Sequence, residues 1–126
     1  MSGPQLVGID LVEPARMADR LSRTPALAAD LFTDEERAYC DSCTHTEQHL
    51  AGRFAAKEAT AKCLGLDGFE HLEIEVVAAG AVTHLELHGD AAARAEELGV
   101  NVFISITHLP SMAAAVAFAR PASTMP

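Results

Sequence analysis

The stretch "LAGRFAAKEATAKCLG", residues 50–65, decides the fold because it forms most of the longest helix that the sequence predicts. The predicted helix begins near Thr46 and ends at Gly65, since glycine is the usual residue just after a helix. Small or apolar residues occur on nearly all of its sides when the stretch is projected at about 100° per residue. This pattern is typical of a helix that is covered on most sides. The sequence therefore predicts a central helix.

The same stretch carries four charged side chains, Arg53, Lys57, Glu58 and Lys62. Arg53 and Lys57, like Glu58 and Lys62, are four residues apart and so are neighbours on the helix surface. One interpretation places them on solvated strips, where a favourable pair contributes roughly 0.2–0.5 kcal/mol. The other directs Glu58 and Lys62 into a polar cleft, where a carboxylate can bind a hard metal ion and a lysine can bind a phosphate. Spacing alone leaves both interpretations open.

Shorter elements surround this helix in the predicted order. A strand is expected at residues 5–10, followed by helices from Pro14, at 25–31 and after Thr33, where Thr33 and Glu36 form a capping-box pattern. Alternating apolar and polar residues predict strands at 72–78 and 82–88, with a short helix at 89–99 and two more strands at 101–108 and 111–119. This order predicts an α+β fold with an antiparallel sheet packed on the long central helix. Residues 1–120 are expected to form a single domain, and residues 121–126 a disordered tail.

Composition and charge narrow the functional classes. The 126 residues carry a net charge of −9, which does not favour a nonspecific nucleic-acid binder. The sequence has no signal-peptide pattern and no apolar run long enough for a membrane span, and its three cysteines are few and odd in number. A cytoplasmic protein with reduced thiols is therefore expected. Against this acidic background, Arg16, Arg20 and Arg23 share one helix face and form a positive stripe suited to an acidic partner.

Asp10 is the second acid of interest because it follows the apolar segment "LVGI". Its ordinary interpretation is a helix N-cap, with Glu13 three residues later completing the cap. The alternative is a Mg²⁺ site, which needs only one or two carboxylates in addition to water and substrate phosphates. Asp10 and Glu58 would suffice, although spacing does not show that they meet.

Four segments of the sequence, taken in order, resemble the small bacterial type of 4′-phosphopantetheinyl transferase, the holo-[acyl-carrier-protein] synthase family. They are "VGIDLVEPARM", "FTDEE", "LAGRFAAKEATAK" and "SITHLPSMAAAVAF", and they extend over nearly the whole chain. The most specific part is the pair formed by G-I-D near the start and F-x-x-K-E-A-x-x-K in the long helix. The resemblance implies transfer of 4′-phosphopantetheine from coenzyme A to a serine of an apo acyl carrier protein. It also implies a requirement for Mg²⁺, release of adenosine 3′,5′-bisphosphate, and a homotrimer with each active site between two subunits.

The resemblance assigns roles to particular residues. Asp10 and Glu58 match the family's metal-binding acids, and Lys62 matches the lysine that contacts the coenzyme A phosphates. Arg53 and His108 match residues of the adenosine and 3′-phosphate pocket, with His108 expected from the neighbouring subunit. The basic residues that the family often has before the long helix are missing from "CTHTEQH", so that His45 is a possible substitute. The helix that docks the acidic carrier protein carries Arg16, Arg20 and Arg23.

Several alternatives stay open at this stage. Either Glu58 or a water on the metal could accept the proton of the carrier serine, and the carrier could serve fatty-acid or polyketide synthesis. A repurposed member of the same fold could bind coenzyme A or a carrier without transferring anything. His108 could also be an ordinary hydrogen-bonded histidine. A zinc site is a further alternative, and its ligands would be Cys40, Cys43, His45 and His49.

Overall fold

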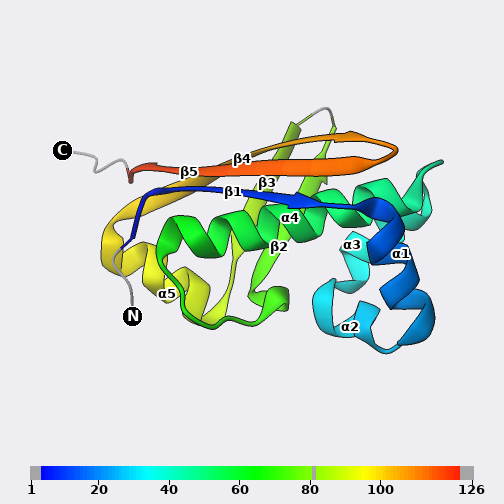
Figure 1. The fold of residues 1–126 in the computed structure, drawn as a ribbon. Coiled ribbons are helices and arrows are strands. Elements are labelled where there is room, and N and C mark those ends of the chain that lie inside the picture. Colours follow the sequence, from blue (N-terminus) through cyan, green and yellow to red (C-terminus); the bar gives the residue numbers. More distant parts are fainter. Residues whose placement is uncertain (1–3, 81, 123–126) are drawn as a thin grey trace.

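The long helix and a three-stranded sheet form the centre of the molecule in the computed structural model, which describes residues 4–80 and 82–122 (Figure 1). Helix α4, Thr46–Leu64, lies along one face of the sheet. The sheet has the strand order β1-β5-β4, all antiparallel, and its strands are β1 (Val7–Val12), β5 (Met112–Pro121) and β4 (Val100–Leu109). The predicted α+β class, with an antiparallel sheet on a central helix, is confirmed.

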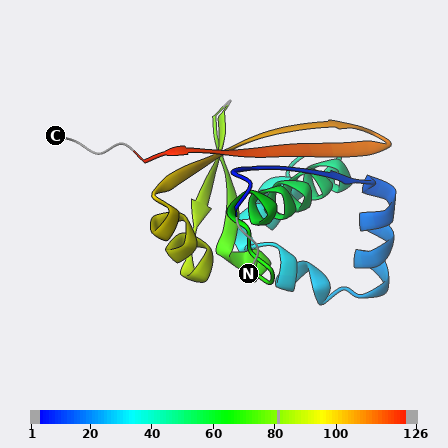
Figure 2. The same cartoon turned by 60° about the vertical axis from the view of Figure 1, so that its left-hand side comes forward.

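The remaining elements surround α4 (Figure 2). Helices α1 (Pro14–Arg23), α2 (Leu27–Leu31) and α3 (Asp34–Asp41) gather on one side of it. The 3₁₀ turn η1 (His71–Glu73) leads into a separate two-stranded sheet of β2 (Ile74–Ala79) and β3 (Val82–Leu87). Helix α5 (Gly89–Leu98) packs near the C-terminal end of α4, where Arg94 Nε donates to the Leu64 carbonyl at 3.0 Å. Helix α4 is therefore covered on most sides, as its sequence predicts.

Small residues bring β1 and β5 close to α4. Ala55 and Ala59 of the helix are buried against Ala115 and Ala117 of β5. Gly8 of β1 is closer still, because a Cβ atom there would lie 2.0 Å from the carbonyl oxygen of Ala59. Only glycine fits this crossing, and the close approach carries the next residues of β1 over the middle of the helix.

The opposite face of the three-stranded sheet is open and apolar. Ile9 and Leu11 of β1 are 63% and 62% exposed, and Phe103 of β4 stacks on Phe118 of β5 with ring centroids 5.6 Å apart. The predicted first strand therefore has one face exposed in this single chain, and its predicted end at Asp10 is wrong. The strand continues two residues further to Val12, because Leu11 and Val12 pair with Ala114 and Ala113 of β5.

The C-terminal part of the chain also differs from the prediction. Strand β5 includes Pro121, and the backbone N–H of Ala122 donates to the Gly99 carbonyl at 2.9 Å. The predicted disordered tail is therefore wrong for residues 121 and 122, which this pairing holds against the end of α5. The rest of that predicted tail, residues 123–126, and residues 1–3 of the predicted single domain lie outside the described residues.

Candidate active site

Asp10 and Glu58 line the same cleft, although β1 and α4 are far apart in the sequence. The cleft has a volume of about 390 Å³ and lies between β1, α1 and the middle of α4. Asp10 does not cap α1, because the N-cap position belongs to Glu13. The cleft is lined by Asp10, Leu11, Val12, Glu13, Arg16, Met17, Arg20, Phe54, Glu58 and Met112.

The two acids influence each other electrostatically. Partial burial raises the pKa of Glu58 above its usual value, and the negative charge of Asp10 raises it further, while Lys62 opposes both effects. Two carboxylates that repel each other across a cleft are an arrangement that a divalent cation relieves. The Nε2 atom of His71 lies 3.9 Å from Glu58 Oε2 and is buried, and it has no hydrogen-bond partner among the described residues.

Lys62 connects the cleft to β1. Its Nζ atom donates to the Ile9 carbonyl at 2.9 Å and to Asp10 Oδ1 at 3.3 Å, while the side chain stays largely exposed. Lys62 also borders a second cleft of about 400 Å³ next to Gly65 and Leu66. Its ammonium group therefore lies between the two clefts and within reach of ligands in either one.

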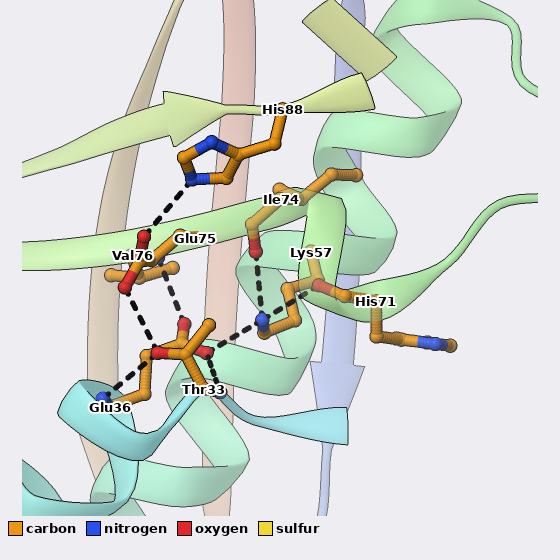
Figure 3. Close-up of polar contacts among 8 residues, drawn as sticks. All are labelled: Thr33, Glu36, Lys57, His71, Ile74, Glu75, Val76 and His88. Carbon is orange, nitrogen blue, oxygen red and sulfur yellow. Dashed lines mark hydrogen bonds and ion pairs between the residues drawn. The ribbon is translucent and has the colours of Figure 1, made fainter. Parts of the chain in front are cut away.

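The environment of Lys57 is neither of the two that the sequence suggested for the helix charges (Figure 3). Its side chain is 0% exposed, and it lies neither on a solvated strip nor in the cleft. The Nζ atom donates to Glu36 Oε1 at 2.8 Å, to the His71 carbonyl at 2.8 Å and to the Ile74 carbonyl at 2.7 Å. Glu36 in turn accepts the backbone N–H groups of Thr33 and Val76, both at 2.9 Å. This buried ion pair joins α3, α4, η1 and β2 next to the cleft.

The sequence indicated a local role for Glu36, as part of a capping box, but not its ion pair with Lys57. The capping box of Thr33 and Glu36 is confirmed, since both of its hydrogen bonds are present. A capping glutamate is normally exposed, however, and nothing in the local pattern indicates that this one turns inward to a lysine 21 residues away. The carbonyls of His71 and Ile74, in and just after η1, accept from Lys57 and so complete its buried environment.

Arg53 and His108 do not line the cleft with Asp10 and Glu58. Arg53 is 5% exposed, and its guanidinium carbon lies 4.5 Å from the centre of the Tyr39 ring. His108 lies near the N-terminal end of α4, where its Nδ1 atom is 2.8 Å from Gln48 Oε1. Ten residues of helix separate Gln48 from Glu58, which corresponds to about 15 Å along the axis. Within one chain, these two predicted ligand-binding regions are therefore separate.

The three arginines of α1 do not have equivalent positions. Arg16 and Arg20 line the cleft beside Asp10 and Glu58. Arg23, in the last turn, forms an ion pair with Asp19 on the exposed surface. Arg16 and Arg20 therefore place positive charge beside the cleft, whereas the charge of Arg23 is paired with Asp19.

The zinc alternative is not supported by the structure. Cys40 is buried, which raises the pKa of its thiol to about 11, and Cys43 Sγ donates to the Tyr39 carbonyl. Within residues 4–80 and 82–122, the group of three side chains whose ligand atoms converge is Glu75, Glu86 and His88, on the two-stranded sheet. Those side chains lie apart from the cleft-lining residues.

Comparisons with known proteins agree with this geometry. A family model described as the 4′-phosphopantetheinyl transferase superfamily matches residues 6–118. The chain belongs to this superfamily. Relatives named holo-[acyl-carrier-protein] synthase from Streptomyces coelicolor and Frankia alni are 44% and 42% identical to it, each over 90% of this chain and 95% of the relative. The range that the family model matches contains Asp10, Glu58 and Lys62.

A solved structure supports the same assignment. The complex of ACPS with CoA from Chronobacterium ammoniagenes is 32% identical, has a TM-score of 0.81 and covers 94% of this chain and 98% of its own. The superfamily fold is therefore present over almost the full length of both chains. Over the residues that the structure describes, no helix has the length and apolar character needed to span a membrane.

Proposed function

We infer that this superfamily member is a holo-[acyl-carrier-protein] synthase, which transfers 4′-phosphopantetheine from coenzyme A to a serine of an apo acyl carrier protein. Relatives of more than 40% identity over nearly the whole chain carry that name. The observation that carries the proposal is the meeting of Asp10 and Glu58 in one cleft, with the Lys62 ammonium group hydrogen-bonded to Asp10. This combination of two acids and a lysine suits a pyrophosphate accompanied by a divalent cation.

Mg²⁺ is the cation that fits these residues. Asp10 and Glu58 offer hard carboxylate oxygens, and Mg²⁺ is commonly held by one or two carboxylates together with water and substrate phosphates. Burial, followed by the charge of Asp10, raises the pKa of Glu58, and a dication would offset the negative charge of the two acids. When bound, Mg²⁺ would neutralise charge on the pyrophosphate as the leaving phosphate departs.

The chain's own residues supply the rest of the transfer. The serine oxygen forms a bond to the phosphorus that carries the pantetheine, and the bond from that phosphorus to the bridging oxygen breaks. Adenosine 3′,5′-bisphosphate leaves, and Lys62 compensates the negative charge that develops on it. Among the chain's own residues, Glu58 is the candidate acceptor of the serine proton, because its carboxylate lines the cleft.

The acceptor would approach along α1. Arg16 and Arg20 border the cleft, and Arg23 follows on the same helix, where it is paired with Asp19. The two arginines at the cleft can steer an acidic carrier protein toward the pyrophosphate. Whether that carrier serves fatty-acid or polyketide synthesis is not distinguished by this surface. We expect a cytoplasmic enzyme, and the three free cysteines agree with a reducing compartment.

We also propose a homotrimer whose active sites lie between subunits. The open sheet face exposes Ile9, Leu11 and other apolar side chains on an otherwise acidic chain, and such a patch favours association. The separation of His108 from Glu58 along α4 supports the same conclusion. The pyrophosphate and the 3′-phosphate of coenzyme A are attached to the same ribose, so we expect His108 of a neighbouring subunit to complete the site to which Asp10 and Glu58 belong.

The test is incubation with coenzyme A, Mg²⁺ and a purified apo acyl carrier protein, followed by mass spectrometry of the carrier. The expected result is a gain of one phosphopantetheine that disappears when the metal is removed with a chelator. Binding of coenzyme A without any gain on several carriers would instead indicate the second candidate, a repurposed member that keeps the fold and the ligand but not the transfer.

A further inference from the structure

His71, in the turn η1, brings an unpaired ring nitrogen close to Glu58. Its Nε2 atom is buried and forms no hydrogen bond with any residue in the described ranges 4–80 and 82–122. Glu58 Oε2 lies 3.9 Å from this atom, on the neighbouring helix α4. Buried polar atoms in folded proteins nearly always have a partner, so an unpaired one calls for an explanation.

Both the backbone and the ring of His71 are held in place. Its carbonyl oxygen accepts from Lys57 Nζ at 2.8 Å, while its ring points away from the buried ion pair of Lys57 (Figure 3). The ring stacks on Phe54, with centroids 5.3 Å apart and planes inclined by 13°, and its centroid lies 4.5 Å from that of Phe69. Phe54 itself lines the cleft that contains Glu58. These contacts fix the position of Nε2 beside the Glu58 carboxylate.

A small movement of Glu58 would convert this contact into a hydrogen bond. The separation of 3.9 Å exceeds the usual N–H···O range of about 2.7–3.2 Å by roughly 1 Å. The flexible glutamate is the partner that can move, because the histidine ring is stacked on Phe54. Hydrogen bonds made by catalytic groups often shorten only when the reacting complex forms.

We propose that His71 is a positioning residue for the metal site, because its Nε2–H donates to Glu58 Oε2 and holds the carboxylate in the orientation that binds the divalent cation. The proposal rests on the proposed function, since the cation is the one inferred for Asp10 and Glu58. It adds that binding of the cation depends on a residue of η1 that is not itself a ligand. Loss of such an outer hydrogen bond typically lowers metal affinity by about 10–100-fold.

Asp10 has a comparable support on the other side of the cleft. Lys62 Nζ donates to Asp10 Oδ1 at 3.3 Å, so the first acid is oriented by a donor from α4. His71 gives Glu58 the same kind of support from η1. An imidazole N–H can orient a carboxylate without adding a positive charge beside it, so the full charge of Glu58 stays available to the cation.

The experiment measures the affinity of the full chain for Mn²⁺ in the presence of coenzyme A, with electron paramagnetic resonance reporting the free ion. His71→Phe keeps a flat ring against Phe54 and Phe69 but removes Nε2, whereas His71→Gln loses the stacked ring but keeps an N–H donor. The Mn²⁺ dissociation constant should rise about tenfold or more in His71→Phe and by less than about threefold in His71→Gln. His84→Phe, which alters an exposed histidine of β3, should bind Mn²⁺ like the wild type and serves as the matched control.

The Mg²⁺ dependence of the transfer rate gives a second readout. A weakened metal site raises the Mg²⁺ concentration that is needed for half of the maximal rate, so the defect of His71→Phe should largely disappear at saturating Mg²⁺. A general structural defect would instead lower the rate at every Mg²⁺ concentration and would overturn the inference.

Failure of this inference and failure of the proposed function give different results. If the wild type modifies the carrier but His71→Phe binds Mn²⁺ as tightly as the wild type, the inference is overturned and the function stands. The same holds if His71→Gln weakens Mn²⁺ binding as much as His71→Phe does. If the two variants differ as expected but no carrier is modified, the positioning role is supported and the transferase is not. If the wild type binds no Mn²⁺ with coenzyme A, the inference fails whatever the carrier assay shows.

Discussion

Replacing Lys57 by methionine tests how strongly the buried ion pair holds the active-site helix. The substitution keeps the length of the side chain but removes the three hydrogen bonds of Nζ, which leaves the buried Glu36 carboxylate without its cation. Breaking a buried pair from one side typically costs about 3–5 kcal/mol. Since a domain of this kind has a total stability of roughly 5–15 kcal/mol, this single change would remove a large share of it.

Urea unfolding followed by circular dichroism measures the effect. The matched control is Lys62→Met, which removes an exposed lysine from the same helix and should cost at most about 1 kcal/mol. The double variant Glu36→Leu with Lys57→Met removes both charges, so its cost should be well below the sum of the two single changes. A Lys57→Met cost within about 1 kcal/mol of the Lys62→Met control would refute the argument. Strict additivity in the double variant would refute it as well.

Three further changes test other parts of the account. Gly8→Ala should lower the free energy of unfolding by at least roughly 1–3 kcal/mol, because its Cβ would lie 2.0 Å from the Ala59 carbonyl oxygen; a urea midpoint equal to that of wild type would contradict the close crossing. Burial, followed by the charge of Lys57, lowers the pKa of His71 in the folded chain below its unfolded value of 6.5. His71 therefore costs no free energy of unfolding above that pH, and the free energy of unfolding decreases as the pH falls toward the folded pKa. His71→Phe should therefore reduce the loss of melting temperature between about pH 7.5 and pH 5.5, and an unchanged loss would show that His71 is not its source. Ile9→Arg should shift the chain to a smaller species in analytical ultracentrifugation, and a wild-type chain that is already monomeric would contradict the proposed use of the sheet face.

The sequence predicts most of the architecture because its local signals agree with the tertiary packing. The alanine-rich stretch at residues 50–65 predicts a covered helix, and in the structure the sheet and the other helices surround it. The alternating strands appear close to their predicted positions because alternation reflects one buried face. The boundary errors have physical causes. Asp10 does not end β1, since pairing with β5 carries the strand on to Val12.

The cleft could be anticipated only through the resemblance. Spacing showed that Glu58 and Lys62 are neighbours on the helix, but it could not place Asp10 against them, because that contact depends on how Gly8 lets β1 cross α4. Neither interpretation of the helix charges placed Lys57 in the core, because local patterns contain no information on a partner in α3. A buried charge is a property of the assembled structure and not of the helix alone.

The structure places the proposed site residues at two positions along α4. Asp10, Glu58 and Lys62 are brought together, whereas Arg53 and His108 lie at another part of α4. This division would be unexpected for a monomeric enzyme, and it is expected for an active site shared between subunits.

The central claim is that Asp10 and Glu58 hold one divalent cation, and metal counting tests it most directly. Mn²⁺, which accepts the same oxygen ligands as Mg²⁺, can be titrated into the full chain in the presence of coenzyme A while electron paramagnetic resonance reports the free ion. The account predicts one bound ion per chain, lost in both Asp10→Asn and Glu58→Gln and retained in Glu75→Gln, which alters the other acidic group. Retention of the ion in both cleft variants, or its loss in Glu75→Gln alone, would contradict the account.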